Sequence, residues 1–331
     1  MENKTHIPLV TGATGFIGGH LAERLVREGH NVRLLVRNAG KLAPALRGAD
    51  IVTGDLCDKA ALEKAVSGVD VIYHCAANVI TWDRPEHYKT ANVNGVENLL
   101  NVVARANPNI ERFVHVSSVD VYDFPATPRD EACALHPCVF GYGESKRQGE
   151  AVVRKICAAH NIPYTILRPA NVIGPKSQFI ARIGKELKSG LMLKINGGRV
   201  NAGFIYVDHL VDYLLWAASS EKAAGETYNA RDDYDVTWAE FIAAFRRAIK
   251  GRGLVVSLPF AVADIAAFFC ALPHKIFRLR GEPLLHRLIV RIFGRTCGHS
   301  AEKIRADSGF AGKTSFDAVL ERSVNWFLEQ T

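Results

Sequence analysis

Short apolar runs alternate along the first half of the chain with segments of helical period. The runs occupy residues 7–10, 32–36, 50–53, 69–74, 113–116 and 164–167, and helical periods occupy 16–26, 60–66, 93–106 and 144–158. Runs of this length are typical of strands that are buried on both faces of a parallel sheet. The alternation therefore predicts an α/β fold with a Rossmann-type, doubly wound parallel sheet and right-handed crossovers.

The alternation becomes less regular after Gly174-Pro175. A short apolar run follows at 204–207, then helices near 208–218 and 237–249, and a final amphipathic helix around 315–328. We expect a dinucleotide-binding domain over 1–175, with 204–220 packing back onto it. A smaller, mostly helical substrate domain is expected from 176–203 and 221–331. Without a low-complexity linker between them, the two domains are expected to pack together.

A glycine-rich turn, TGATGFIG at 11–18, lies between the first apolar run and the first helix. Gly12 permits a tight turn, Gly15 lets the backbone approach phosphates, and Gly18 lets the helix pack closely on the strand. The helix N-terminus then offers free N–H groups and a positive dipole end. The turn predicts a pyrophosphate site that includes Thr14, Phe16 and Ile17; a glycine turn without a ligand is the alternative.

Tyr142 and Lys146 stand four residues apart at the start of a helix, so both project from one face. A free tyrosine, with a pKa of about 10, is a poor base near neutrality. A nearby ammonium and the positive charge of an oxidised nicotinamide would favour the tyrosinate. Tyr142 could then exchange a substrate hydroxyl proton while hydride moves to or from the cofactor. The spacing alone is a weak signal, and its place after the glycine turn and Ser117-Ser118 gives it weight.

Composition indicates a globular protein with a basic C-terminal part. The 331 residues are 48% hydrophobic and 23% charged, and the seven cysteines contain no CxxC pair. This usage favours reduced thiols and a cytoplasmic location, and no metal-ligand spacing occurs. The net charge is +7. Residues 274–305 contain eight Lys/Arg and two Glu, which would suit an anionic lipid surface, an acidic partner or nucleic acid, or simply form a solvated helix face.

The motifs resemble those of one family, the extended short-chain dehydrogenases/reductases. Besides the glycine turn they include GDL at 54–56, HCAA at 74–77, ANVNG at 91–95, VSS at 116–118, YGESK at 142–146 and RPANVIGP at 168–175. The chain also ends as the family usually does, with KIRADSGF at 303–310 and VNWFL at 324–328. The resemblance runs nearly end to end and implies a nicotinamide-dependent enzyme.

The resemblance also implies roles for individual residues. Ser118 would join Tyr142 and Lys146 in catalysis by hydrogen-bonding the substrate oxygen, with Ser117 as the fallback. Turn chemistry at strand ends is the alternative for each singly. The expected cofactor-binding set is Gly12, Thr14, Gly15, Phe16, Ile17, Gly18, Arg37, Lys41, Asp55, Leu56, Ala76, Ala77, Asn92, Ser117, Tyr142, Lys146, Pro169 and Val172.

Arg37 bears on the choice of cofactor. It ends the second predicted strand, where an NAD enzyme would usually place an acid for the ribose hydroxyls. An arginine can instead bond a 2′-phosphate bidentately, and Lys41 would add a second charge. We expect NADP, with NAD as the alternative. The other interpretation of Arg37 is a surface arginine that binds no cofactor.

Two segments bear on the substrate. Ala202 stands where sugar-nucleotide members of the family commonly carry an arginine for the diphosphate, which argues against a nucleotide sugar. Residues 254–272 are apolar, broken by Pro259 and Asp264, and are expected to form a substrate-domain helix rather than a membrane crossing. A basic amphipathic helix is expected next, within 275–295, with Arg287, Arg291 and Arg295 on one face. This resembles the branch that contains 3β-hydroxysteroid dehydrogenases, sterol decarboxylating dehydrogenases and dihydroflavonol reductases.

The leading hypothesis is an NADP(H)-dependent oxidoreductase that interconverts a hydroxyl and a ketone on a bulky apolar molecule, sterol-, isoprenoid- or flavonoid-like. The alternatives are a nucleotide-sugar epimerase/dehydratase and a cofactor-sensing regulator without turnover. Segment 254–295 would be either a lid over the substrate or a peripheral contact with the inner face of a membrane. We expect no nucleic-acid partner, and a homodimer is compatible with the sequence.

Overall fold

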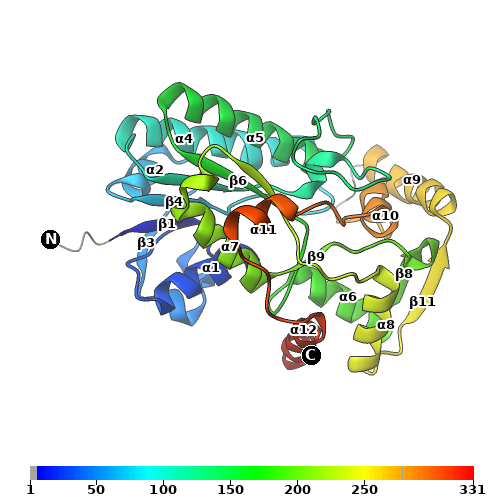
Figure 1. Cartoon of the computed structure of the whole chain (residues 1–331). Coiled ribbons are helices and arrows are strands. Elements are labelled where there is room, and N and C mark those ends of the chain that lie inside the picture. The colour runs from blue at the N-terminus through cyan, green and yellow to red at the C-terminus, as the bar shows by residue number, and fades with distance from the viewer. Residues whose placement is uncertain (1–5, 278, 280) are drawn as a thin grey trace.

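A seven-stranded parallel sheet forms the centre of the computed structural model, which describes residues 6–331 except 278 and 280 (Figure 1). The strand order is β10-β6-β5-β4-β1-β2-β3. The strands are β1 (Pro8–Thr11), β2 (Arg33–Val36), β3 (Asp50–Thr53), β4 (Val71–His74), β5 (Arg112–Val116), β6 (Tyr164–Pro169) and β10 (Thr227–Ala230). The order reverses between β1 and β4, as in a doubly wound sheet. The predicted Rossmann-type fold is confirmed.

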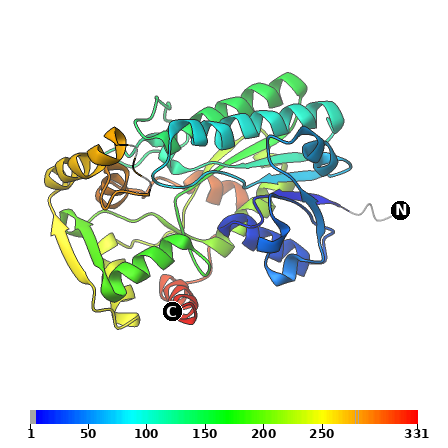
Figure 2. The same cartoon turned by 180° about the vertical axis from the view of Figure 1, so that it is seen from behind.

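Helices cover both faces of this sheet, as the two opposite views show (Figures 1 and 2). One face carries α2 (Lys59–Val66), α4 (Gly95–Ala106) and α5 (Gly141–His160), and the other carries α1 (Phe16–Arg27) and α7 (Val207–Ser219). Neighbouring residues of one strand, Leu9 and Val10, belong to the two opposite apolar layers and are both fully buried. This two-sided burial explains why the strands are continuous apolar runs.

Most of the remaining elements form a third apolar cluster beside the sheet. It contains α6 (Gln178–Ser189), α8 (Trp238–Ala248) and α12 (Phe316–Glu329), with two parallel strand pairs: β7 (Asn171–Ile173) with β9 (Phe204–Tyr206), and β8 (Leu191–Ile195) with β11 (Leu254–Leu258). Trp238 lies at its centre, fully buried, with the Phe293 ring 4.4 Å away. The exact division of the chain at residue 175 stays a prediction.

Two expectations for the C-terminal part were wrong in detail. Residues 254–258 form strand β11, because they pair with β8, and helix α9 (Phe260–Ile276) begins only after Pro259. The basic helix expected within 275–295 covers only Arg287–Gly294 (α10), so Arg295 follows the helix instead of lying within it. Arg278 and Arg280 lie outside the described residues. Another difference is a π-helical turn, Thr90–Asn94, just before α4. No helix among the described residues is long and apolar enough to cross a membrane.

Candidate active site

The glycine turn leaves no room for side chains between β1, α1 and β4. Gly12 has a φ of +77°, and a Cβ built on it would lie 2.7 Å from the backbone nitrogen of Ala76. A Cβ on Gly18 would lie 2.5 Å from the carbonyl oxygen of Gly12. The first turn of α1 has no side-chain cap, and Thr14 and Gly15 are exposed in front of it. This bare helix N-terminus is what a dinucleotide pyrophosphate requires.

Ser118, Tyr142 and Lys146 come together at the carboxyl end of the sheet. Ser118 follows β5, is 8% exposed, and lies close to the Tyr142 side chain. Lys146, one helical turn after Tyr142, is buried and donates from Nζ to the carbonyl oxygen of Val116, 2.8 Å away. The arrangement can hold a substrate oxygen between two hydroxyl groups while a proton passes through one of them.

The protonation of Tyr142 differs from the expectation. Burial raises the pKa of Tyr142 above its ordinary value, and nearby Asp120 raises it further, while the nearby Ser118 hydroxyl opposes the rise. Burial also lowers the pKa of Lys146 to about 8. Lys146 therefore does not by itself produce a tyrosinate. In the protein without cofactor, Tyr142 is a proton donor, which suits the reductive direction.

The side chains of two predicted cofactor residues, Ser117 and Asn92, form hydrogen bonds within the protein. Ser117 donates its hydroxyl proton to Glu150 (2.7 Å), so Ser118 is the better candidate for catalysis. Asn92 is buried, donates to Ser145 and the carbonyl oxygen of Asn78 (both 2.9 Å), and accepts from the Asn78 N–H (2.7 Å). Asn92 therefore joins the loop after β4 to α5 through its side chain, and its role as a cofactor contact stays a prediction.

The remaining predicted cofactor residues lie at the carboxyl ends of the strands. Ala76 and Ala77 follow β4, Pro169 ends β6, Val172 lies on β7, and Asp55 and Leu56 follow β3. Arg37 and Lys41 follow β2 and are exposed. Neither forms an ion pair or side-chain hydrogen bond with any residue that the structure describes, so both cations are open to a ligand. Their roles in binding stay predictions.

The sequence interpretation missed Glu150, which is fully buried under Ser117. Its carboxylate accepts from Arg168 Nε (2.8 Å) and Nη2 (2.7 Å), and from Arg154 at the surface (3.0 Å). A signal was available, because Glu150 continues the i, i+4 series of Tyr142 and Lys146 along one face of α5. The pair holds β6 against the catalytic helix.

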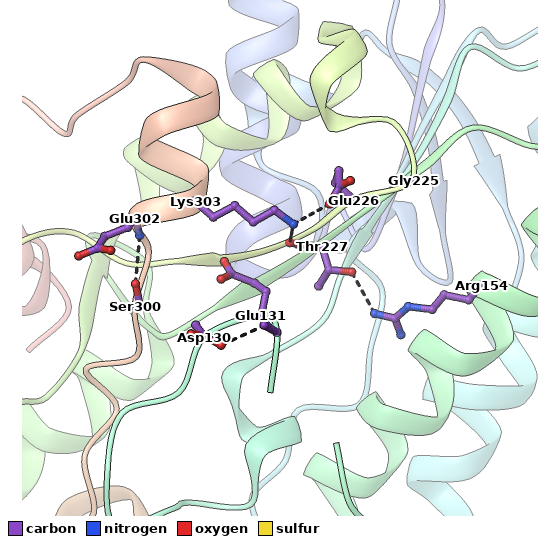
Figure 3. Close-up of a pocket in the computed structure, with 10 residues that line it drawn as sticks. Asp130, Glu131, Arg154, Gly225, Glu226, Thr227, Ser300, Glu302 and Lys303 are labelled. Atoms are coloured by element: carbon purple, nitrogen blue, oxygen red, sulfur yellow. Dashed lines mark hydrogen bonds and ion pairs between the residues drawn. The ribbon is translucent and has the colours of Figure 1, made fainter. Parts of the chain in front are cut away.

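A hollow of about 620 Å³, whose lining includes Arg154 but none of Ser118, Tyr142 and Lys146, lies at the free edge of β10 (Figure 3). The Glu131 carboxylate accepts from the Asn229 N–H (2.7 Å), and Lys303 donates to the carbonyl oxygen of Thr227 (3.1 Å). These side chains satisfy the backbone groups that a further strand would use. The hollow is thus the closed edge of the sheet, and its charged lining suits no apolar substrate. No group of three metal-ligating side chains occurs among the residues that the structure describes.

The sequence profile described as "NAD dependent epimerase/dehydratase family" matches residues 8–230. The chain belongs to this family. It is thus an enzyme of the extended short-chain dehydrogenase/reductase type, as its motifs predicted. The glycine cradle described above fits the nicotinamide dinucleotide that the family uses.

Curated relatives of different activities cover nearly the whole chain. The 2-alkyl-3-oxoalkanoate reductase of Stenotrophomonas maltophilia is 27% identical over 95% of this chain and 97% of its own. The 4-hydroxy-2-methyl-3-oxo-4-farnesyl-3,4-dihydroquinoline-1-oxide ketoreductase of Stigmatella aurantiaca is 28% identical over 94% of both chains. The N-acetyl-alpha-D-glucosaminyl-diphospho-ditrans,octacis-undecaprenol 4-epimerase of Escherichia coli O157:H7 is 24% identical over 96% of this chain and 94% of its own.

Solved structures share the whole fold. The crystal structure of gox2253 superposes with a TM-score of 0.79, at 24% identity and 98% coverage of both chains. MoeE5 in complex with UDP-glucuronic acid and NAD superposes with a TM-score of 0.78, at 21% identity, covering 98% of this chain and 99% of that one. At these identities the likeness shows the fold alone.

Proposed function

We propose that this enzyme is an NADP(H)-linked oxidoreductase that interconverts a hydroxyl and a ketone on a bulky apolar substrate. The observation that carries the proposal is the cluster of Ser118, Tyr142 and Lys146 at the carboxyl edge of the sheet, beside the bare N-terminus of α1. When bound, the cofactor would supply hydride to the ketone carbon. Tyr142 then gives its hydroxyl proton to the substrate oxygen, while Ser118 donates a hydrogen bond to that oxygen.

The preference for NADP rests on Arg37 and Lys41, two exposed cations after β2 that form no ion pair with any acidic residue the structure describes. A guanidinium can bond a 2′-phosphate bidentately, whereas NAD offers it only a hydroxyl. We expect NADPH to bind at least tenfold more tightly than NADH, about 1.4 kcal/mol, and Arg37→Ala to remove most of that gap. Arg47→Ala is the matched control, since Arg47 is also an exposed arginine but lies beyond Lys41. Equal dissociation constants for the two cofactors in the wild-type protein would refute the preference.

An apolar substrate is favoured by two observations. Ala202, at the position of the diphosphate-binding arginine of sugar-nucleotide members, is fully buried and belongs to the apolar cluster. Two of the curated relatives are, by their names, reductases of alkyl- or farnesyl-bearing ketones. The test is NADPH consumption with long-chain 3-oxo esters and sterol ketones, run beside an epimerisation assay with UDP-glucose. Turnover of the nucleotide sugar alone would favour the epimerase alternative, to which the name of the Escherichia coli relative points.

Peripheral contact of segment 254–295 with a membrane is the second part of this proposal, and the exposed residues of α9 support it. This helix buries small residues, Ala263, Ala267 and Ala271, and presents large apolar ones to solvent. The exposed side chains are Val262, Ile265, Phe268, Phe269 and Ile276, between 45% and 62% exposed, and Phe277 follows at 72%. A helix packed only for its own stability would place these groups inward.

The arginines in and directly after α10 are less available to a membrane surface than expected. Arg287 donates from Nε to the Asp264 carboxylate (3.0 Å), and the Arg291 guanidinium lies 3.5 Å from the same carboxylate. Arg291 and Arg295 also stack on the Phe260 ring, at 4.8 and 4.5 Å. The three arginines thus turn toward α9, and the apolar face of α9 would make the contact instead.

Sedimentation with vesicles tests this contact. We expect the wild-type protein to co-sediment with anionic vesicles, and Ile265→Ser combined with Phe269→Ser to abolish most of this binding. The double variant should keep its fold because both side chains are at least 60% exposed. Arg287→Gln should have a smaller effect, since its charge is paired. A wild-type protein that stays in the supernatant with anionic vesicles at low salt would leave segment 254–295 as a lid. Homodimer formation stays an expectation that the same preparation can test by its molar mass in solution.

A further inference from the structure

The ring of Tyr88 lies beside the ring of Tyr142, close to the residue at which helix α5 begins. Tyr88 belongs to α3 (Pro85–Lys89) and is only 3% exposed. The centroids of the two rings are 6.3 Å apart and the ring planes are inclined by 59°, as in a favourable aromatic pair. A Cβ built on Gly141, the first residue of α5, would lie 3.0 Å from Cδ2 of Tyr88. The Tyr88 ring therefore fills the space directly in front of the catalytic helix.

The side chain of Tyr142 has to be held by packing instead of by its own hydroxyl. That hydroxyl must be free to meet a substrate oxygen, so a lasting bond to the protein would compete with the reaction. The backbone of Tyr142 is held separately, because its carbonyl oxygen accepts from the Ser145 hydroxyl (2.7 Å). This bond leaves the side-chain torsions of Tyr142 free to turn. The flat ring of Tyr88 limits that turning.

The loop that follows β4 holds Tyr88 in turn. The Tyr88 hydroxyl donates to the carbonyl oxygen of Ile80. The Ile80 N–H donates to Oδ1 of Asn78 (3.2 Å). The backbone of Asn78 bonds the buried side chain of Asn92 twice, through its N–H (2.7 Å) and its carbonyl oxygen (2.9 Å). The acceptor of the Tyr88 hydroxyl thus belongs to a loop that is itself fixed to the core.

The same loop is also bonded to the elements beside the sheet. Thr81, its next residue, donates from Oγ1 to the carboxylate of Glu282 (2.8 Å), which lies between α9 and α10. This carboxylate accepts as well from Arg182 on α6 (2.9 Å) and lies 2.6 Å from Nε2 of His286. The ring next to the catalytic tyrosine is therefore anchored, through one loop, to both parts of the molecule.

We propose that Tyr88 is a positioning residue that holds the Tyr142 ring at the angle from which its hydroxyl meets the substrate oxygen. Tyr88 acts through Tyr142, because its own hydroxyl is engaged with the Ile80 carbonyl. A displacement of about 1 Å in a reacting group can slow a reaction by about 10²-fold, so a loosened ring would cost turnover without affecting cofactor binding. This inference rests on the proposed function, since it takes Tyr142 to give a proton to a substrate carbonyl.

A double-mutant cycle on kcat tests this role, with NADPH-dependent reduction of a long-chain 3-oxo ester as the assay. Tyr88→Leu keeps an apolar group but removes the flat ring. It should lower kcat by about tenfold, while the dissociation constant of NADPH stays within about twofold of the wild-type value. Tyr88→Phe keeps the ring and should stay within about threefold of the wild-type kcat. In an enzyme that already carries Tyr142→Phe, Tyr88→Leu should change the residual kcat by less than about twofold, because the proton donor that it positions is gone.

The matched control is Tyr228→Leu. Tyr228 is also fully buried and donates its hydroxyl to a backbone carbonyl, that of Lys222 (3.1 Å), but its ring packs against Trp216. This control should keep the wild-type kcat per folded enzyme, although it costs stability. An undiminished kcat in Tyr88→Leu would overturn the inference. So would an equal fall with and without Tyr142→Phe, since a general loss of structure acts alike in both backgrounds.

Gly141→Ala decides if Tyr88→Leu does not fold, because its Cβ would press on the Tyr88 ring without leaving a cavity. It should lower kcat when Tyr142 is present and leave the residual kcat of Tyr142→Phe unchanged, and the same fall in both would contradict the inference. An absence of wild-type turnover with every ketone would instead be a failure of the proposed function, and the inference would fall with it.

Discussion

Replacement of Glu150 by alanine should strongly destabilise the fold. The Glu150 side chain is fully buried, and the side chain of its main partner Arg168 is only 3% exposed. Two short bonds join them, from Nε to Oε1 (2.8 Å) and from Nη2 to Oε2 (2.7 Å). In Glu150→Ala the Arg168 guanidinium keeps its charge, loses both carboxylate bonds and stays out of water.

The size of the loss follows from that unpaired charge. Breaking a buried pair by removing one partner costs about 3–5 kcal/mol. Ser117 also loses its acceptor. Whole domains are stable by about 5–15 kcal/mol, so Glu150→Ala should remove about a fifth or more of the free energy of unfolding.

Urea unfolding followed by circular dichroism measures the difference. Arg154→Ala is the matched control, because Arg154 bonds the same carboxylate (3.0 Å) with a side chain that is 39% exposed. It should cost about 1 kcal/mol or less. If Glu150→Ala loses no more stability than Arg154→Ala, the buried pair does not hold β6 to α5 as we argue.

Three further predictions concern the same region. Gly18→Ala should abolish NADPH binding, measured by nicotinamide fluorescence, because its Cβ would meet the Gly12 carbonyl oxygen at 2.5 Å; Gly29→Ala, with open space around it, should bind normally although its φ of +85° costs stability. Gly143→Ala should lower kcat while NADPH affinity stays within twofold, because the new Cβ would lie 2.5 Å from the carbonyl oxygen of Asp120, whose N–H holds Ser118 Oγ. Although burial opposes it, Arg168 holds the pKa of Glu150 below its ordinary value. The stability that Glu150 contributes is therefore full above the unfolded pKa of about 4.3 and is lost as pH falls below it. Glu150→Gln should show a shallower decline in melting temperature between about pH 5 and 3, and an unchanged decline would contradict the assignment.

The sheet and the glycine turn could be predicted from the sequence because both depend on local patterns. Strands buried on two faces are apolar runs, and the turn needs glycine wherever a Cβ would meet backbone, as at Gly12. The pairing of Tyr142 with Lys146 also depends only on helix geometry. Each of these signals spans a few residues.

The rest could not be predicted because it depends on contacts between distant segments. The Asn92 side chain donates a hydrogen bond to Ser145, 53 residues further along the chain, and no local pattern in the sequence indicates this pairing. The helical period showed that Arg287 and Arg291 share a face, but Asp264 on another helix decides where they point. The strand β11 forms because β8 lies beside it.

The central claim is that Tyr142 transfers the proton in a nicotinamide-linked reduction. The most direct test is kcat of Tyr142→Phe with NADPH and the best apolar ketone. We expect a loss of about two orders of magnitude or more, with NADPH affinity and unfolding midpoint unchanged, because the substitution removes a proton donor and nothing else. A Tyr142→Phe enzyme that reduces this ketone at close to the wild-type rate would contradict the account.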